Sequence, residues 1–286
     1  MLYPKICEAV RYIKTRPHAM TAAIPTNGVL LSDYEFCRKI VDCGLNYADI
    51  SLKGKDSKEW LSVTGYDGFI QQMRAIENLS GSGVDFTCSM VITHENVETF
   101  CEAVEHAYNA GGRKFSFTFV VDNDKKGERG RKYLEANNPI LLVDKFMSQV
   151  STLDKITAGE WWIEYSFPEC VYSKEPLAKL RGRLARPCHV HNGGSLTFDT
   201  KLNLIPCSMF IDEVLGKFGT DFSSLSELES YTRSAAYKGI MTSLNMLPSN
   251  ECDSCVNKAS CLGGCPCFWE HCTFEEFMKF KNDADV

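Results

Sequence analysis

The sequence contains no apolar run long enough to cross a bilayer, since FSFTFVV and ILLV have only the length of strands. Its first fourteen residues lack the apolar segment of a secretory signal. Basic residues are not in excess: 31 Lys and Arg against 37 Asp and Glu give a net charge of −6. A broad nucleic-acid surface normally needs a basic excess. These absences predict a cytoplasmic protein with no membrane partner and no nucleic-acid partner.

The composition is that of a globular protein, and its cysteines are unevenly spread. The 286 residues are 44% hydrophobic and 24% charged, which allows one large domain or two modest ones. Of the 14 cysteines, six are scattered over the first 170 residues and eight fall between Cys188 and Cys272. A charged, proline-ended segment, RGRLARP (181–187), marks the change. We therefore predict two domains, residues 1–185 and residues 186–286.

Strand-like and helix-like segments alternate through the first domain. The helices are expected at 4–16, 32–44, 66–83, 96–112 and 140–155. The strands are expected at 19–28, 46–54, 84–92, 114–121 and 161–167. A repeat of about 25–35 residues is typical of βαβ units with right-handed crossovers. The sequence predicts an α/β fold with a parallel sheet, either an open doubly wound sheet or part of a barrel.

Polar residues stand where these strands end, and parallel sheets bind ligands at that edge. They are Thr26-Asn27, Ser51 to Gly54, Thr93 to Asn96 and Asp122-Asn123. The alternative is that they only form turns and helix caps, as Asn, Ser, Thr and Asp often do.

The second domain carries a dense array of thiols. Its centre is Cys252-x2-Cys255-x5-Cys261-x3-Cys265, followed by Cys267 and Cys272. Upstream, Cys188 and Cys207 flank a predicted hairpin that turns at 199–201. A four-iron cluster takes about four thiolates, so eight thiols could hold two clusters.

Zinc, disulfides and scattered structural cysteines are the alternatives to iron and sulfur. A zinc ribbon usually has two CxxC pairs, whereas this array has one. Disulfides need an oxidising compartment, which nothing in the sequence indicates. Isolated structural cysteines would not gather in this way. The pattern favours iron–sulfur clusters, with zinc as the main alternative.

The array resembles the C-terminal signature of the SPASM branch of the radical SAM enzymes, which mature peptides and proteins. The matching positions are Cys188, Cys207, Cys252, Cys255, Cys261, Cys265 and Cys272, with Cys267 as the alternative last cysteine. The hairpin departs from the family, since it is longer and has Leu202 where the family has glycine.

The resemblance also implies which thiols hold which cluster. In this family the array holds two auxiliary [4Fe-4S] clusters. Cys252, Cys255, Cys261 and the last cysteine would hold one of them. Cys188, Cys207 and Cys265 would share the other, with Cys170 as a possible fourth ligand.

The resemblance extends into the first domain, through IPTNGVLLSD, ISLKG, VTGYDGFIQQMRAI and CSMVITHENV. It implies an incomplete parallel (β/α) partial TIM barrel of radical SAM type, followed by a small cysteine-rich SPASM domain. By this resemblance Ser51 would lie beside bound S-adenosyl-L-methionine, and Thr26 and Asn27 would line the same mouth.

Two family motifs do not occur in these 286 residues: CxxxCxxC, whose thiolates hold the cluster that cleaves the cofactor, and GGEP. In the family, the GGEP motif runs directly into a Leu-Tyr-Pro helix, and this chain begins MLYP. We therefore expect a fragment of a radical SAM/SPASM enzyme that is inactive alone. A degenerate paralogue that binds a peptide without radical chemistry is the less favoured interpretation.

Three functions follow from these patterns. The first is a maturase whose complete form uses the 5′-deoxyadenosyl radical to modify a side chain of a peptide or protein substrate, with ferredoxin or flavodoxin as a reductant. The second is a non-catalytic iron–sulfur module for peptide binding or electron transfer. The third is a zinc-binding protein. Metal content separates the last two, since paired clusters would bring about eight irons and a zinc site about one zinc.

Overall fold

The computed structural model describes residues 4–18, 21–121, 127–164, 167–180, 182–185 and 188–284. The chain divides into two compact units that are not continuous in sequence. The first unit comprises residues 1–120, 144–164 and 182–184. The second comprises residues 121–143, 165–181 and 185–286. In the described part of the chain, no helix combines the length and the apolarity required to cross a membrane.

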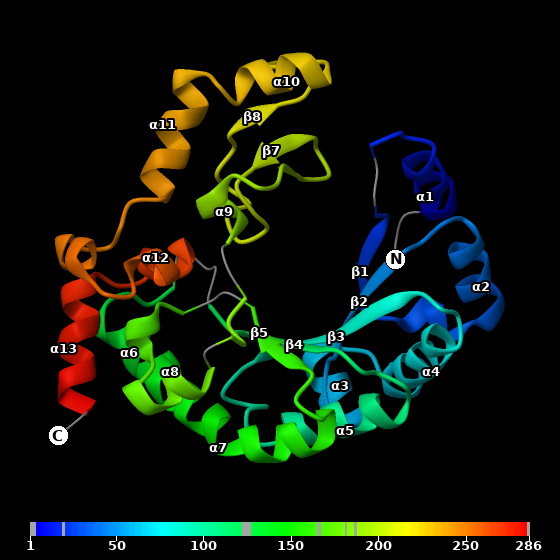
Figure 1. Cartoon of the computed structure of the whole chain (residues 1–286), viewed down its shortest axis with the longest axis horizontal. Helices are drawn as coiled ribbons and strands as arrows, with labels where there is room; N and C mark the ends of the chain where they lie inside the picture. Colours follow the sequence, from blue (N-terminus) through cyan, green and yellow to red (C-terminus); the bar gives the residue numbers. More distant parts are fainter. Residues whose placement is uncertain are drawn as a thin grey trace. The chain divides into compact units, whose positions relative to one another are not determined.

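The first unit is built on a five-stranded sheet in which all strands are parallel and follow the order of the chain (Figure 1). The strands are β1 (Ala23–Thr26), β2 (Tyr47–Ser51), β3 (Asp85–Ile92), β4 (Phe115–Phe119) and β5 (Trp161–Ile163). The predicted α/β fold with a parallel sheet is therefore confirmed. Each of these strands is shorter than its predicted range, which is usual because the ends of elements are the least sharply defined part.

Helices connect successive strands, and α2 to α5 lie on one side of the sheet in Figure 1. They are α1 (Ile6–Lys14), α2 (Tyr34–Asp42), α3 (Ser57–Thr64), α4 (Phe69–Ser80), α5 (Phe100–Asn109) and α7 (Pro139–Thr157). Helix α2 begins at Tyr34, two residues later than its predicted range, because the Asp33 carboxylate caps it by accepting a hydrogen bond from the Phe36 amide at 2.9 Å. Helix α3 was not predicted, nor was the 3-10 turn η1 (Val29–Ser32).

The apolar side chains of the strands face these helices. Phe117 in the centre of β4 is 1% exposed, and its ring centroid lies 5.3 Å from that of Phe100 on α5. Phe100 in turn stacks on Phe146 of α7 at 5.2 Å. Because side chains alternate across a strand, the residues on either side of Phe117 point to the opposite face of the sheet. The polar side chains of β4 therefore lie on the face of the sheet opposite these helices.

The second unit combines short helices with a small antiparallel sheet. Its strands, in order, are β6 (Thr197–Phe198), β7 (Asn203–Ile205) and β8 (Gly216–Lys217). The predicted hairpin is confirmed, since the Asp199 carboxylate accepts from the amides of Lys201 and Asn203 at 2.8 Å. Leu202 adopts a φ of 60°, a left-handed conformation that favours glycine. The residue type departs from the family at this position, but the backbone takes the form that glycine would give it.

Helices and turns make up the rest of the second unit. The helices are α6 (Arg131–Asn137), α8 (Lys174–Leu180), α9 (His189–Asn192), α10 (Leu225–Tyr231), α11 (Ala235–Leu244), α12 (Lys258–Cys261) and α13 (Phe274–Ala284). The 3-10 turns are η2 (Glu169–Val171), η3 (Asn250–Ser254) and η4 (Pro266–Glu270). Around α13, the buried rings of Phe268 and Phe277 lie 5.7 Å apart and Trp269 packs against both. This aromatic cluster supports the segment that carries the last cysteines.

Candidate functional site

The first unit contains a cavity of about 660 Å³ lined by the polar side of its sheet. Three serines of neighbouring strands stand in register there, Ser51 opposite Ser89 and Ser89 opposite Ser116. Residues in register on adjacent parallel strands present their side chains on the same face. The three hydroxyls therefore form a row across β2, β3 and β4 along the cavity floor.

Charged side chains surround this row, and most are acidic. Asp49, Glu59, Glu95 and Glu164 line the cavity together with one lysine, Lys53. Burial lowers the pKa of the Lys53 ammonium, and the Asp49 carboxylate partly opposes that change. Among the described residues, the buried Oδ1 atom of Asp49 has no hydrogen-bond partner. The cavity is therefore suited to a ligand that carries positive charge and hydrogen-bond donors.

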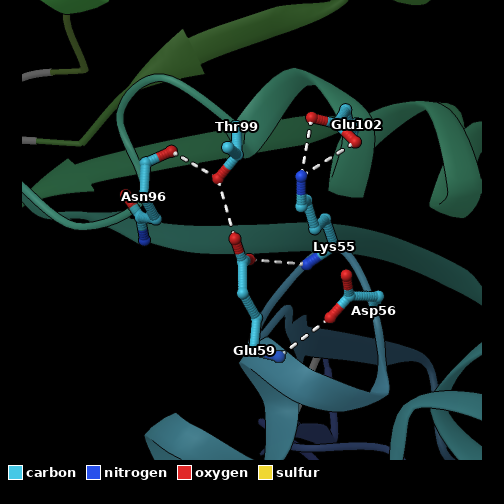
Figure 2. Close-up of polar contacts among 6 residues, drawn as sticks. All are labelled: Lys55, Asp56, Glu59, Asn96, Thr99 and Glu102. Carbon is cyan, nitrogen blue, oxygen red and sulfur yellow. Dashed lines mark hydrogen bonds and ion pairs between the residues drawn. The ribbon is translucent and has the colours of Figure 1, made fainter.

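A polar network orders the loops that follow β2 and β3 at the edge of this cavity (Figure 2). Asp56 caps α3 by accepting from the Glu59 amide at 2.8 Å, and Glu59 reaches back to the Lys55 amide at 2.9 Å. The other carboxylate oxygen of Glu59 accepts from the Thr99 hydroxyl at 3.0 Å. The Lys55 ammonium pairs with Glu102 at 3.0 Å. Glu59 thus ties the start of α3 to the loop before α5.

The three residues expected at the S-adenosylmethionine site differ in where their side chains lie. Ser51 lines the cavity. The Thr26 hydroxyl is buried and accepts from the Gly28 amide at 3.1 Å, and the Asn27 side chain accepts from the Val29 amide at 3.2 Å. These two side chains therefore form turn contacts, which was the alternative interpretation. The buried amide of Gln72 holds the strand ends together by donating to the backbone oxygens of Asn27 (2.8 Å) and Ser51 (2.9 Å).

Two further strand ends were predicted to carry ligand-binding residues. Thr93, Glu95 and Asn96, which follow β3, line the cavity as expected of ligand-binding loops. Asp122 and Asn123, expected at the end of β4, lie outside the described residues.

Sequence reasoning did not select Asp49, Ser89, Ser116 or Glu59. For Ser89, Ser116 and Glu59 the sequence does contain a signal. Ser89 and Ser116 are small polar residues between apolar neighbours in their strands, where period-two alternation assigns them to the face opposite the helices. Asp56 and Glu59 have the spacing of a capping box before the apolar Trp60.

The second unit contains a separate cavity of about 210 Å³ whose wall is rich in thiols. Cys170, Cys252, Cys255 and Cys261 all line it. Burial raises the pKa of the Cys170 thiol to about 12, and the nearby Cys261 and Cys252 thiols add to the rise. Burial likewise raises the pKa of Cys252, to which the neighbouring Cys261 and Cys255 contribute. Cys170 and three motif cysteines thus lie around one space.

A second set of thiols gathers around Cys265. Cys188 and Cys207 each interact with Cys265, and burial raises the pKa of both thiols. Cys265 and Cys267 share a hydrogen bond that lowers the pKa of Cys265 and raises that of Cys267. Cys207 also contributes to the raised pKa of Cys267. The structure thus brings Cys267, the alternative last cysteine of the array, to the three thiols that the resemblance groups together.

Helix α9 links Cys188, the first cysteine of this second set, to the cysteine motif. Cys188 stands at the N-cap of α9, and the Nε2 atom of His191 lies 3.0 Å from the Gly264 carbonyl oxygen. Gly264 immediately precedes Cys265. This polar contact therefore holds helix α9 against the segment that leads into Cys265.

The donor chemistry of both sets fits iron–sulfur clusters, which are held by cysteine thiolates. The cavity of about 210 Å³ is several times the ~30 Å³ that one water occupies in the liquid, so a group of several atoms fits it. Among the described residues, no three His, Cys, Asp or Glu side chains form a group that could hold a single metal ion.

Gly264 is expected to be essential to the turn beside the thiol cavity. It has a φ of +79°, and an added Cβ would lie 2.5 Å from the Pro168 nitrogen and 2.7 Å from its Cα. Gly264→Ala should therefore lower the free energy of unfolding by about 2–4 kcal/mol, from backbone strain and overpacking. Gly239→Ala is the matched control, because its Cβ meets open space within α11 and should add about 0.5–1 kcal/mol. Urea unfolding of both variants measures the difference, and equal stabilities would contradict the expectation.

Comparison with known proteins relates this fold to one group of enzymes. No family model matches the chain. GTP 3′,8-cyclase of Chlorobaculum tepidum, a radical SAM family member, is 37% identical over 79 residues. Those residues are 28% of this chain and 23% of the cyclase, so the match spans less than a quarter of that relative.

Two solved structures share most of the chain's architecture. The structure of anSMEcpe with bound AdoMet has a TM-score of 0.61 at 16% identity, covering 93% of this chain and 75% of that one. Streptococcus suis SuiB bound to S-adenosylmethionine has a TM-score of 0.57 at 15% identity, covering 91% and 57%. Both are SPASM-type radical SAM maturases. The five-stranded parallel sheet with its helices is therefore the partial (β/α) barrel of the radical SAM enzymes, and the chain has their fold.

Proposed function

We propose that this chain belongs to a radical SAM/SPASM maturase that modifies a side chain of a peptide or protein. The observation that carries the proposal is the thiol-lined cavity, formed by the C-x2-C-x5-C motif in a chain with the radical SAM fold. Residues 1–185 would act as the partial barrel and residues 186–286 as the SPASM domain.

The thiols would hold auxiliary [4Fe-4S] clusters in two sets. Cys252, Cys255 and Cys261 would bind one cluster, and the resemblance adds Cys272 to them. Cys188, Cys207 and Cys265 would bind the other. When bound, such a cluster accepts or donates one electron at a potential set by its ligands and burial. The chain's own contribution would be to hold the thiolates around each cluster.

The cavity of the first unit would hold S-adenosyl-L-methionine and the reacting end of the substrate. Ser51 would lie beside the cofactor, with Thr26 and Asn27 shaping the turn next to it. The acidic lining supports this role, because S-adenosylmethionine carries a sulfonium and an ammonium group that Asp49 and Glu164 could attract.

A peptide partner is supported by the relatives of this fold. The anSMEcpe structures include one with a bound Cp18Cys peptide, and SuiB has been solved with the precursor peptide SuiA. A one-electron donor such as ferredoxin or flavodoxin would be the reductant. Because these 286 residues contain no CxxxCxxC, the radical-generating step is assigned to no residue of this chain. By itself the chain would then act as an iron–sulfur module that binds substrate.

Metal content after anaerobic reconstitution with iron and sulfide tests the proposal. We expect about eight irons and eight sulfides per chain, as two four-iron clusters require. A chain that instead takes up about one zinc and no iron would be a zinc protein, and the proposal would be wrong.

Binding of S-adenosyl-L-methionine provides a second test, on the first unit. Ser51→Leu would fill the floor of the cavity, and we expect the dissociation constant to rise at least tenfold, about 1.4 kcal/mol. Tyr34→Phe, on the exposed side of α2, should leave binding unchanged. Isothermal titration of the reconstituted chain measures both, and equal affinities would place the cofactor elsewhere.

A further inference from the structure

We infer that Cys170 supplies the fourth thiolate to the cluster held by Cys252, Cys255 and Cys261. This inference rests on the proposed function, but it changes the ligand set that the resemblance implies. In the ligand set that the resemblance implies, the last cysteine (Cys272, with Cys267 as the alternative) completes this cluster, and Cys170 is a possible fourth ligand of the other cluster.

The walls of the cavity are the first argument. Cys170 lines the space of about 210 Å³ together with the three motif cysteines. Electrostatic interaction also links its thiol to those of Cys261 and Cys252. The described residues that line this cavity include no other cysteine. Four thiols around one space match the four thiolates that a four-iron cluster takes.

The turn that carries Cys170 is attached to the motif itself. The backbone amide of Glu169 donates to the Cys261 sulfur at 3.2 Å. The Glu169 side chain, 7% exposed, accepts from the Ser260 hydroxyl at 2.8 Å. An amide that donates to a thiolate stabilises its charge, as amides do around iron–sulfur ligands. Both contacts hold Cys170 at a defined position relative to Cys261.

Two further contacts anchor the same turn. The ammonium of Lys281 on α13 donates to the Cys170 carbonyl oxygen at 2.7 Å. At the start of the turn, Pro168 packs so tightly against Gly264 that no side chain fits at position 264. Contacts with α13 and with the motif therefore fix this turn. They give Cys170 the pre-organised position that a metal ligand needs.

Cys272 stands in a different environment. It is 5% exposed, and its sulfur lies 4.0 Å from the Phe268 carbonyl oxygen, within the aromatic cluster of η4 and α13. Free cysteines in such surroundings behave as small apolar residues. Cys272 lies close enough to Cys170 for their thiols to interact. Cys272 is not among the described residues that line the cavity.

The test compares Cys170→Ala with Cys272→Ala in the full chain after anaerobic reconstitution. We expect the wild-type chain to bind about eight irons, Cys272→Ala about eight and Cys170→Ala about four. Electron paramagnetic resonance of the dithionite-reduced chain should show one cluster signal lost in Cys170→Ala and both kept in Cys272→Ala. Circular dichroism verifies that each variant is folded.

A small thiol adds a second readout. 2-Mercaptoethanol included during reconstitution should restore the iron of Cys170→Ala, because it can enter the space that the side chain leaves. Loss of iron in Cys272→Ala alone, equal loss in both variants, or full iron content in Cys170→Ala would overturn the assignment. A wild-type chain that binds no iron would instead contradict the proposed function, so the two failures are distinguishable.

Discussion

Cys261→Ala is expected to halve the iron content of the reconstituted chain, from about eight irons to about four. Cys261 lines the thiol cavity and accepts the Glu169 amide, so its removal takes away both a ligand and the contact that anchors the neighbouring turn. Loss of one thiolate from a four-ligand set opens the cluster to solvent and to oxidation. Colorimetric iron analysis and the visible absorption of the anaerobic chain measure the loss.

The matched control for Cys261→Ala is Cys7→Ala. Cys7 is a half-buried thiol on α1 in the first unit and belongs to neither thiol set. We expect this variant to keep about eight irons. If Cys261→Ala kept the same iron content as Cys7→Ala, the assignment of the C-x2-C-x5-C motif as a cluster site would be wrong.

Phe117→Ala is expected to lower the free energy of unfolding of the first unit by about 3–5 kcal/mol. Phe117 is 1% exposed and packs edge-to-face on Phe100, Phe146 and Trp161, with centroids 5.3, 5.7 and 6.1 Å away. Alanine would leave a cavity between the sheet and two helices that cannot close without moving the backbone. Urea unfolding followed by tryptophan fluorescence measures the change, since Trp161 lies against the site.

Val91→Ala provides the comparison for Phe117→Ala. Val91 lies on the neighbouring strand β3 but points to the other face and is 49% exposed. Its truncation should change the free energy of unfolding by no more than about 0.5 kcal/mol. A loss of under about 1 kcal/mol for Phe117→Ala would show that the helices do not pack on this face as described.

The fold of the first unit was largely predictable because its signals are local. Apolar alternation and helix caps at residues such as Asp33 identified the strands and the five helices between 4 and 155. Helix α3 escaped prediction because its apolar content is small and its start depends on the reciprocal bonds of Asp56 and Glu59. A short helix with one buried residue, Trp60, leaves little periodicity to detect.

The candidate site in the first unit was predictable only in part. Polar residues at strand ends indicated the edge of the sheet at which this cavity lies, and Ser51 and Thr93 line it. Thr26 and Asn27 stand at the same edge, yet their side chains bond to their own turn. Whether a polar side chain serves a turn or a cavity depends on which face of the strand it occupies. That face follows from strand register, which pairing between distant segments sets.

The spacing of the motif cysteines determined by itself where thiols would gather, because CxxC and its neighbours lie within a few turns of backbone. The alternating pattern likewise determined the parallel α/β architecture. Only the tertiary structure decided which thiols share a space. The turn of Cys170 is tied to the motif by the Glu169 amide and to α13 by Lys281, contacts between segments far apart in the chain. Such contacts depend on how whole elements pack, and no local pattern of residues encodes them.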